Sequence, residues 1–219
     1  MMERRRHITT IGLILALVLS FVTYPALEVK ADPSMGVKNG SKKTLINSAA
    51  DRKEGYYIYF SDMPDSVKKV KVSVSKKSVI KVKYIGYGMF VVQPKKTGTS
   101  KVTVTGVADA KKITRKCTIK IVNFKQPFKC LKIDGKDYRK KVKSSGNGIG
   151  VKTKKSKIKF NYKLNSGWKV VDARADGKKV KNGKTYSLSI GEQYVGIELY
   201  VKNKKTGETV AVWGTIEKK

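Results

Sequence analysis

The chain contains few side chains that could do chemistry. Its only histidine, His7, lies in the N-terminal segment ahead of a long apolar run. The rest of the chain therefore has no imidazole to serve as base for a serine or cysteine nucleophile, and histidine-based zinc sites are excluded. It also lacks a Gly-x-x-x-x-Gly-Lys phosphate loop and a dinucleotide fingerprint. The sequence predicts no catalytic residue, no cofactor and no metal site.

Three local pairs of carboxylates are the candidates for glycosidase chemistry, which needs two carboxyl groups about 5 to 10 Å apart. Each pair lies next to a proline or glycine, where aspartate accepts hydrogen bonds from backbone donors, so turn formation explains the pairs more simply. Calcium at the third pair is disfavoured, because the ion needs six or more oxygen ligands and lysines stand nearby. The pairs are Asp62 with Asp65, Asp134 with Asp137, and Asp172 with Asp176.

Short strands must position these groups, because apolar and polar residues alternate along much of the chain. Val70, Val72 and Val74 share one face of such a strand, and lysines and a serine occupy the other. Proline and glycine punctuate the pattern at turn-like intervals, so residues 42–123 are predicted to form a β-sandwich domain. Its predicted strands are Thr44–Asn47, Tyr56–Phe60, Lys68–Ser75, Val79–Val82, Met89–Gln93, Lys101–Gly106 and Arg115–Val122.

Three segments of this domain resemble the group 2 bacterial immunoglobulin-like domain. They are Ser73–Val82, Phe90–Pro94 and Thr97–Thr105, in which a serine-rich strand, a short strand and a Gly-Thr turn lead into alternating valine and threonine. The sequence departs from that family at Tyr87–Val91, where a Gly-x-Val-Thr-Ala segment would stand. The resemblance implies a secreted or surface-displayed bacterial sandwich module that acts as a spacer or adhesive unit and rarely as a catalyst.

A second all-β pattern begins after Gln126-Pro127, and residues 124–219 are interpreted as a second immunoglobulin-like sandwich. Three dipeptides, Asp134-Gly135, Asp176-Gly177 and Asn182-Gly183, predict tight turns, because their residues tolerate positive φ. Residues 144–156 are rich in Gly, Ser and Lys and are predicted to form an exposed mobile loop. No helix of ordinary length is predicted after the N-terminal segment. The predicted strands are Phe128–Ile133, Lys157–Leu164, Trp168–Ala173, Thr185–Ile190, Val195–Lys202 and Thr209–Ile216.

The only two cysteines, Cys117 and Cys130, fall on either side of the junction between these domains. In an exported protein an even number of cysteines favours a disulfide. Here it would bridge the two domains, and closing that loop would stabilise the folded state by about 3 kcal/mol. The alternative is two separate buried thiols that pack as small apolar side chains. The Cys, Trp, Cys order of antibody domains is absent, since Trp168 and Trp213 both follow Cys130.

A dense aromatic segment, Tyr56–Phe60, allows two interpretations. Alternation places Tyr57 and Tyr59 on the face opposite Ile58 and Phe60, so that one set can be exposed. Exposed rings stack on the apolar face of sugars, whereas inward rings serve cross-strand packing, which sheets favour. The sequence leaves the ligand, if there is one, unidentified.

The N-terminal residues 1–31 are predicted to be a signal peptide, followed by a flexible leader over 32–41. Their apolar run, Ile11–Val22, suits a signal core and is shorter than the about 20 residues of a membrane span. Cleavage is expected between Ala31 and Asp32, which would leave no membrane span; the alternative is an uncleaved N-terminal anchor. The sequence therefore predicts a protein that is secreted or associated with the cell surface.

The formal net charge of +33 predicts attraction to polyanions. The alternative is that lysines solvate the outer faces and edges of strands, since they are spread along the chain and alternate with apolar residues. Few arginines remain after the signal, and sequence-specific base readout depends on the planar arginine fork, so specific recognition of nucleic acid is not expected.

These observations favour a non-enzymatic module for adhesion or display that binds anionic wall polymers or glycans through a lysine-rich surface. A general polyanion or nucleic-acid binder is the first alternative, and it differs by predicting tight DNA binding that falls steeply with salt. An accessory domain of a carbohydrate-active system is the second. A hydrolase would need a carboxylate pair inside a cleft.

Overall fold

The structure, a computed structural model, describes residues 36–187 and 194–218. Residues Gly36–Lys219 group into one compact unit. The predicted signal peptide (1–31), its cleavage point at Ala31 and Asp32, and the start of the leader lie outside the described residues. Within the described ranges, no helix has both the length and the apolar character needed to cross a bilayer.

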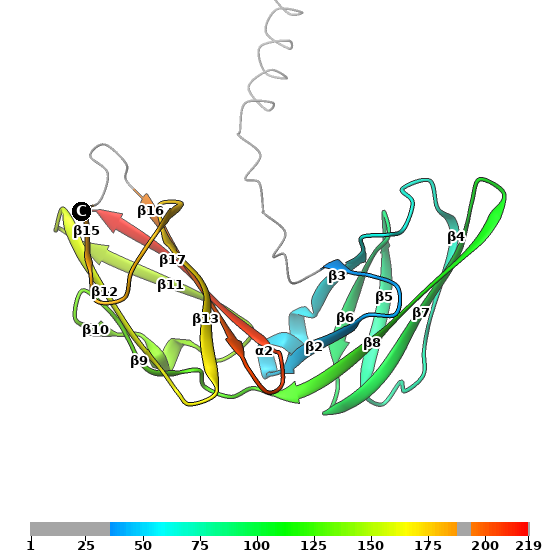
Figure 1. Ribbon diagram of the computed structural model, residues 1–219, viewed down its shortest axis with the longest axis horizontal. Coiled ribbons are helices and arrows are strands. Elements are labelled where there is room, and N and C mark those ends of the chain that lie inside the picture. Colours follow the sequence, from blue (N-terminus) through cyan, green and yellow to red (C-terminus); the bar gives the residue numbers. More distant parts are fainter. Residues whose placement is uncertain (1–35, 188–193, 219) are drawn as a thin grey trace, which may run out of the picture. The chain divides into compact units, whose positions relative to one another are not determined.

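The first half of this unit forms two four-stranded sheets, ordered β1-β3-β6-β5 and β2-β8-β7-β4 (Figure 1). A six-residue helix, α2 (Ala49–Glu54), connects β2 to β3 and is capped at its N-terminus by Ser48. The strands are β1 (Gly36–Val37), β2 (Lys42–Asn47), β3 (Tyr56–Phe60), β4 (Lys68–Val74), β5 (Ile80–Gly86), β6 (Met89–Pro94), β7 (Gly98–Ala108) and β8 (Lys111–Asn123).

The second half forms sheets ordered β10-β9-β12-β15 and β11-β17-β16-β13-β14. A 3₁₀ turn, η1 (Arg139–Lys141), follows β10. The strands are β9 (Phe128–Ile133), β10 (Lys136–Asp137), β11 (Gly146–Thr153), β12 (Lys157–Leu164), β13 (Trp168–Ala175), β14 (Lys178–Lys179), β15 (Thr185–Ser187), β16 (Tyr194–Asn203) and β17 (Thr209–Lys218).

The strand orders are those of immunoglobulin-like sandwiches. An immunoglobulin domain places strands A-B-E-D in one sheet and G-F-C in the other. The first half has this strand order in β1-β3-β6-β5 and β8-β7-β4, although its two-residue β1 pairs parallel with β3 instead of antiparallel. The second half reproduces A-B-E as β9-β12-β15 and G-F-C as β17-β16-β13. In both halves an additional strand, β2 or β11, pairs parallel with the last strand. The predicted fold class, two tandem immunoglobulin-like sandwiches, is confirmed.

The cores follow from alternation along the strands. In β3 the side chains of Tyr56, Ile58 and Phe60 are buried, and in β7 those of Val102 and Val104 are buried. Each fully buried side chain of this kind contributes about 1.5–3 kcal/mol. The second core contains a larger cluster that packs around Leu131, Phe160, Leu199 and Val212.

The tight turns predicted from dipeptides are confirmed. Asp134 and Gly135 have φ values of 50° and 84° between β9 and β10. Asp176 and Gly177 have φ values of 52° and 68° between β13 and β14. Gly183 also has a positive φ, 77°. These residues tolerate the left-handed region that such hairpins require.

The prediction of a mobile loop over residues 144–156 is wrong. Residues Gly146–Thr153 form β11, which pairs in parallel with β17 along its whole length (Figure 1). Its inward side chains, Asn147, Ile149 and Val151, are buried, and its glycines face outward. The glycine-rich composition concealed this alternation. The predicted leader also differs, because Gly36–Val37 pairs with β3 as β1.

Several side chains join the two sandwiches. The Ser145 hydroxyl donates to the buried carboxylate of Asp51 at 2.5 Å, and the Ser48 hydroxyl donates to the same carboxylate at 2.6 Å. Thr44 donates to the carbonyl oxygen of Thr206 at 2.8 Å. Ile46, in β2, belongs to the apolar cluster of the second sandwich. These contacts connect β2 and α2 to the second core.

Candidate binding surfaces

In each of the three carboxylate pairs considered for catalysis, at least one member is bound by a cation. Asp62 pairs with Arg115 at 3.1 Å, and Asp134 pairs with Lys155 at 2.8 Å. Arg139 lies 2.7 Å from Asp137 and holds the pKa of that exposed carboxyl below its ordinary value, mainly through their hydrogen bond. The Asp172 carboxylate is bound by Arg174 at 2.7 Å.

None of these pairs forms a metal site either. In the part of the chain that the structure describes, no group of three or more His, Cys, Asp or Glu side chains is arranged to hold a metal ion. The carboxylates instead satisfy turns and neutralise neighbouring cations, as their positions beside glycine and proline indicate.

The two cysteines are free, so the predicted disulfide between Cys117 and Cys130 is not formed in the structure. Cys117 lies in β8 opposite Val102 and points into the first core, where burial raises the pKa of its thiol to about 12. Cys130 is half-buried in β9 opposite Lys163, on the outer face of its sheet. One thiol faces the first core and the other faces out of the second, which is why they do not meet.

The aromatic segment divides between core and surface as its alternation indicates. Tyr57 is 59% exposed and stands beside Val91 of β6, whereas Ile58 is fully buried. Tyr87, at the tip of the β5–β6 turn, is 86% exposed and has a φ of 49°. The hydroxyl of the inward Tyr56 donates to the carbonyl oxygen of Ile46 at 3.0 Å. Burial, reinforced by the charge of Asp51, raises the pKa of Tyr56.

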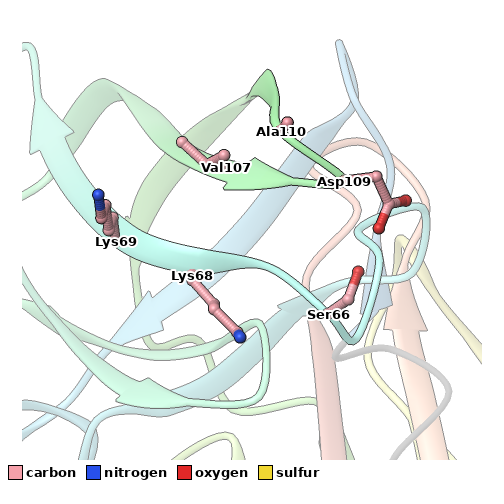
Figure 2. A pocket seen from close by; sticks show the side chains of 6 residues that line it. All are labelled: Ser66, Lys68, Lys69, Val107, Asp109 and Ala110. Atoms are coloured by element: carbon pink, nitrogen blue, oxygen red, sulfur yellow. The ribbon is translucent and has the colours of Figure 1, made fainter.

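A shallow hollow of about 280 Å³ lies between the start of β4 and the β7–β8 turn (Figure 2). Figure 2 shows Ser66 and Asp109 facing each other at one end, while Lys69 lies at the other. The lining side chains are short or exposed, and the backbone is irregular here because Lys69 and Asp109 have positive φ. The hollow is a consequence of this irregular strand edge, and it presents no enclosed polar group to a ligand.

A row of lysines lies on the outer face of the sheet β10-β9-β12-β15. We call it the lysine face, and it consists of Lys132, Lys157, Lys159 and Lys163. Lys132 of β9 is in register with Asn161, which lies between Lys159 and Lys163 on β12. The three lysines of β12 are two or four residues apart, so their side chains share the outer face of the sheet. Neighbouring strands lie about 4.8 Å apart, which brings Lys132 of β9 close to them. Asp137 is in register with Lys132, but Arg139 already binds it.

The lysine face was present in the sequence only as an alternation. Lys157 and Lys159 could be assigned to one face of a strand because Ile158 and Phe160 alternate with them. The proximity of Lys132 could not be derived, because it depends on the antiparallel register of β9 with β12. A strand pattern establishes which side a residue faces and leaves its neighbour across the sheet undetermined.

Comparison with known proteins finds similarity only among solved structures. No protein-family profile and no curated protein matches the sequence, so the resemblance to the group 2 bacterial family is not confirmed. The fibronectin(III)-like modules of CbhA from Clostridium thermocellum match with 12% identity and a TM-score of 0.31, over 82% of this chain and 90% of that one.

Two further structures match at a similar level. The tandem Ig repeats of Dlar match with 13% identity and a TM-score of 0.33, over 83% of this chain and 95% of that one. The EC1-2 fragment of human protocadherin-24 matches with 10% identity and a TM-score of 0.28, over 82% and 94%. Because these identities and TM-scores are low, the immunoglobulin-like assignment depends on the strand order described above.

Proposed function

We propose that this protein is an exported, non-enzymatic module for adhesion or display that holds anionic wall polymers or glycans through the lysine face. The support is the grouping of Lys132, Lys157, Lys159 and Lys163 on one outer sheet face. Rigid strands fix the spacing of these four ammonium groups, so a polymer with repeating negative charge can contact several of them at once. Such binding depends on electrostatic attraction and counterion release, and therefore weakens with salt.

Two variants of equal charge distinguish binding through the lysine face from binding through the high overall charge of the chain. In the test variant, Lys132, Lys159 and Lys163 are each replaced by glutamine. In the matched control, Lys77, Lys95 and Lys96, which are exposed in the turns of the first sandwich, are each replaced by glutamine. Both variants lose the same charge, so a difference between them reports position alone.

The measurement is retention on purified bacterial cell wall, with wall stripped of its anionic polymers as the blank. The test variant is expected to lose most of its retention at low salt, while the control variant keeps most of it. Equal retention of the two variants would contradict the lysine face. Equal retention of the native protein on intact and stripped wall would contradict the proposed function as a whole.

A further inference from the structure

Tyr87 has a backbone conformation that tyrosine disfavours. Gly86 and Met89 are in register across β5 and β6, so Tyr87 and Gly88 form a two-residue turn, and their φ values are 49° and 70°. Hairpin turns with positive φ at both positions normally contain Asn-Gly, Asp-Gly or Gly-Gly, because a larger side chain is strained in the left-handed region. Tyrosine at the first position therefore makes this hairpin less stable than asparagine would.

Packing of the Tyr87 ring does not offset this strain. The ring is 86% exposed, compared with 59% for Tyr57, the next in exposure among the large apolar side chains of the described residues. The turn is held from its inner side instead, where the Gly88 amide donates to the Tyr84 hydroxyl at 3.4 Å. A residue that is both strained and exposed contributes little to folding, and strained residues are concentrated at functional sites.

Two further exposed apolar side chains flank the turn. Ile85, at the bulge that ends β5, is 40% exposed, and Met89, at the start of β6, is 36% exposed. We call Ile85, Tyr87 and Met89 the apolar tip. Six large apolar side chains are exposed in the described ranges, and three of them lie within these five residues. Single exposed apolar residues are common, whereas a group of them at one turn indicates an interaction surface.

The surroundings of the apolar tip are cationic. Residues 66–108, which include β4 to β7, contain no aspartate or glutamate. Lys83 and Lys81 are exposed on β5, and at about 3.3 Å per residue they lie about 7 and 13 Å behind Ile85 along the strand. The turns before β4 and between β7 and β8 lie at the same end of the first sandwich (Figure 1). Their exposed charged residues are Lys68, Lys69, Lys111 and Lys112, with Asp65 and Asp109.

We propose that the apolar tip is a docking site for an anionic lipid surface. The order of its side chains matches that of a bilayer surface. When the tip enters the boundary between headgroups and acyl chains by about 5–10 Å, Lys83 lies at the level of the lipid phosphates. The amphipathic ring of tyrosine suits this boundary. Because β5 is the edge strand of its sheet, the tip lies at a corner of the sandwich, from which it can reach a flat surface.

A lipid surface fits the apolar tip better than a protein does. A second copy of this chain would bring Lys81 and Lys83 of both copies together, so like charges would oppose the contact. A stable protein complex buries roughly 800 Å² on each partner, whereas the apolar tip is a single convex turn. A deformable bilayer can surround such a turn without a complementary groove.

The first test is co-sedimentation of the purified protein with vesicles of phosphatidylglycerol and phosphatidylcholine, and with vesicles of phosphatidylcholine alone, in about 0.15 M NaCl. The native protein should bind the anionic vesicles more strongly. Tyr87→Asn is expected to weaken that binding by roughly tenfold, since burial of one large apolar side chain corresponds to about that factor. Its urea midpoint should equal or exceed the native value, because asparagine tolerates positive φ.

Tyr57→Asn is the matched control, because it removes an exposed ring from β3, away from the turn, without changing the charge. It should keep the native partition between vesicles and solution. Native partition in Tyr87→Asn would overturn the proposal, as would the absence of any binding to anionic vesicles. An equal loss in the two variants would assign the contact to the outer face of the sheet and would also overturn insertion through the tip.

The second test measures insertion directly. Tyr87→Trp places a fluorophore at the tip, and the native Trp168 and Trp213, which lie in the second sandwich, supply the background. Vesicles that contain brominated lipid should quench the variant more strongly than the native protein, because bromine quenches indole only at short range. Equal quenching of the two proteins would overturn the proposal and favour an acidic protein as the partner of the tip. Loss of cell-wall retention in the lysine-face variant would not affect this result.

Discussion

At the scale of single residues, the two thiols differ in access. Cys117 is 2% exposed and faces the first core, whereas Cys130 is half-buried on an outer face. In the native protein, iodoacetamide should therefore modify Cys130 and leave Cys117 intact, because the thiolate is the reactive form and burial disfavours it. Both should react after denaturation without reductant, as measured by mass spectrometry. Failure of both to react in denaturant would show that the bridge predicted from the sequence exists.

The buried thiol also predicts an effect of alkaline pH on stability. Burial raises the pKa of Cys117 from 9.0 to about 12. Between these values the folded chain keeps a proton that the unfolded chain releases, so the free energy of unfolding should fall as pH rises above about 9, by up to about 1.4 kcal/mol per pH unit. Urea denaturation at pH 8 and above pH 10 measures this fall. Cys117→Ala should reduce the dependence on pH, and an unchanged dependence would contradict the buried position of the thiol.

At the scale of elements, β11 is the strand that the sequence analysis missed. The buried side chain of Ile149 faces the second core, where it belongs to the main apolar cluster. Ile149→Ala should therefore lower the free energy of unfolding by about 2–4 kcal/mol, a typical cost for truncating a buried isoleucine. The exposed Lys154, which directly follows the strand, provides the control. Lys154→Ala should change the free energy of unfolding by less than about 0.5 kcal/mol. Equal urea midpoints for the two variants would restore the interpretation of this segment as a loop.

The same element shows what a sequence can and cannot predict in this fold. Strands with valine, isoleucine or aromatic residues at alternate positions were predicted closely, and β3, β9 and β12 have their predicted bounds. In β11 the first three outward positions are glycines, which lack the polar side chains that make an alternation visible. Glycine is generally unfavourable in strands, so the composition indicated a loop.

At the scale of the whole molecule, the contacts between the sandwiches predict coupled unfolding. The Asp51 carboxylate, 7% exposed, accepts hydrogen bonds from Ser48 and from Ser145 of the other sandwich. Ser145→Ala removes one donor from a buried charge, which costs about 1–3 kcal/mol. Trp168 and Trp213 both lie in the second sandwich, so tryptophan fluorescence follows that sandwich, whereas far-ultraviolet circular dichroism follows the strands of both.

In the native protein the two signals should change together in urea, and in Ser145→Ala they should separate. Ser156→Ala, an exposed serine within the second sandwich, is the control and should leave them coincident. Signals that already separate in the native protein would contradict coupling through the Asp51 contact.

The salt dependence of binding to an anionic polymer tests the proposed function most directly. Each cation that neutralises a phosphate contributes about −0.7 to −0.9 to the slope of log K against log salt concentration. For binding to a soluble anionic wall polymer, replacing Lys132, Lys159 and Lys163 by glutamine is expected to reduce the steepness of that slope by about two units or more. The variant with Lys77, Lys95 and Lys96 replaced is expected to keep the native slope. Identical slopes for all three proteins would contradict binding through the lysine face.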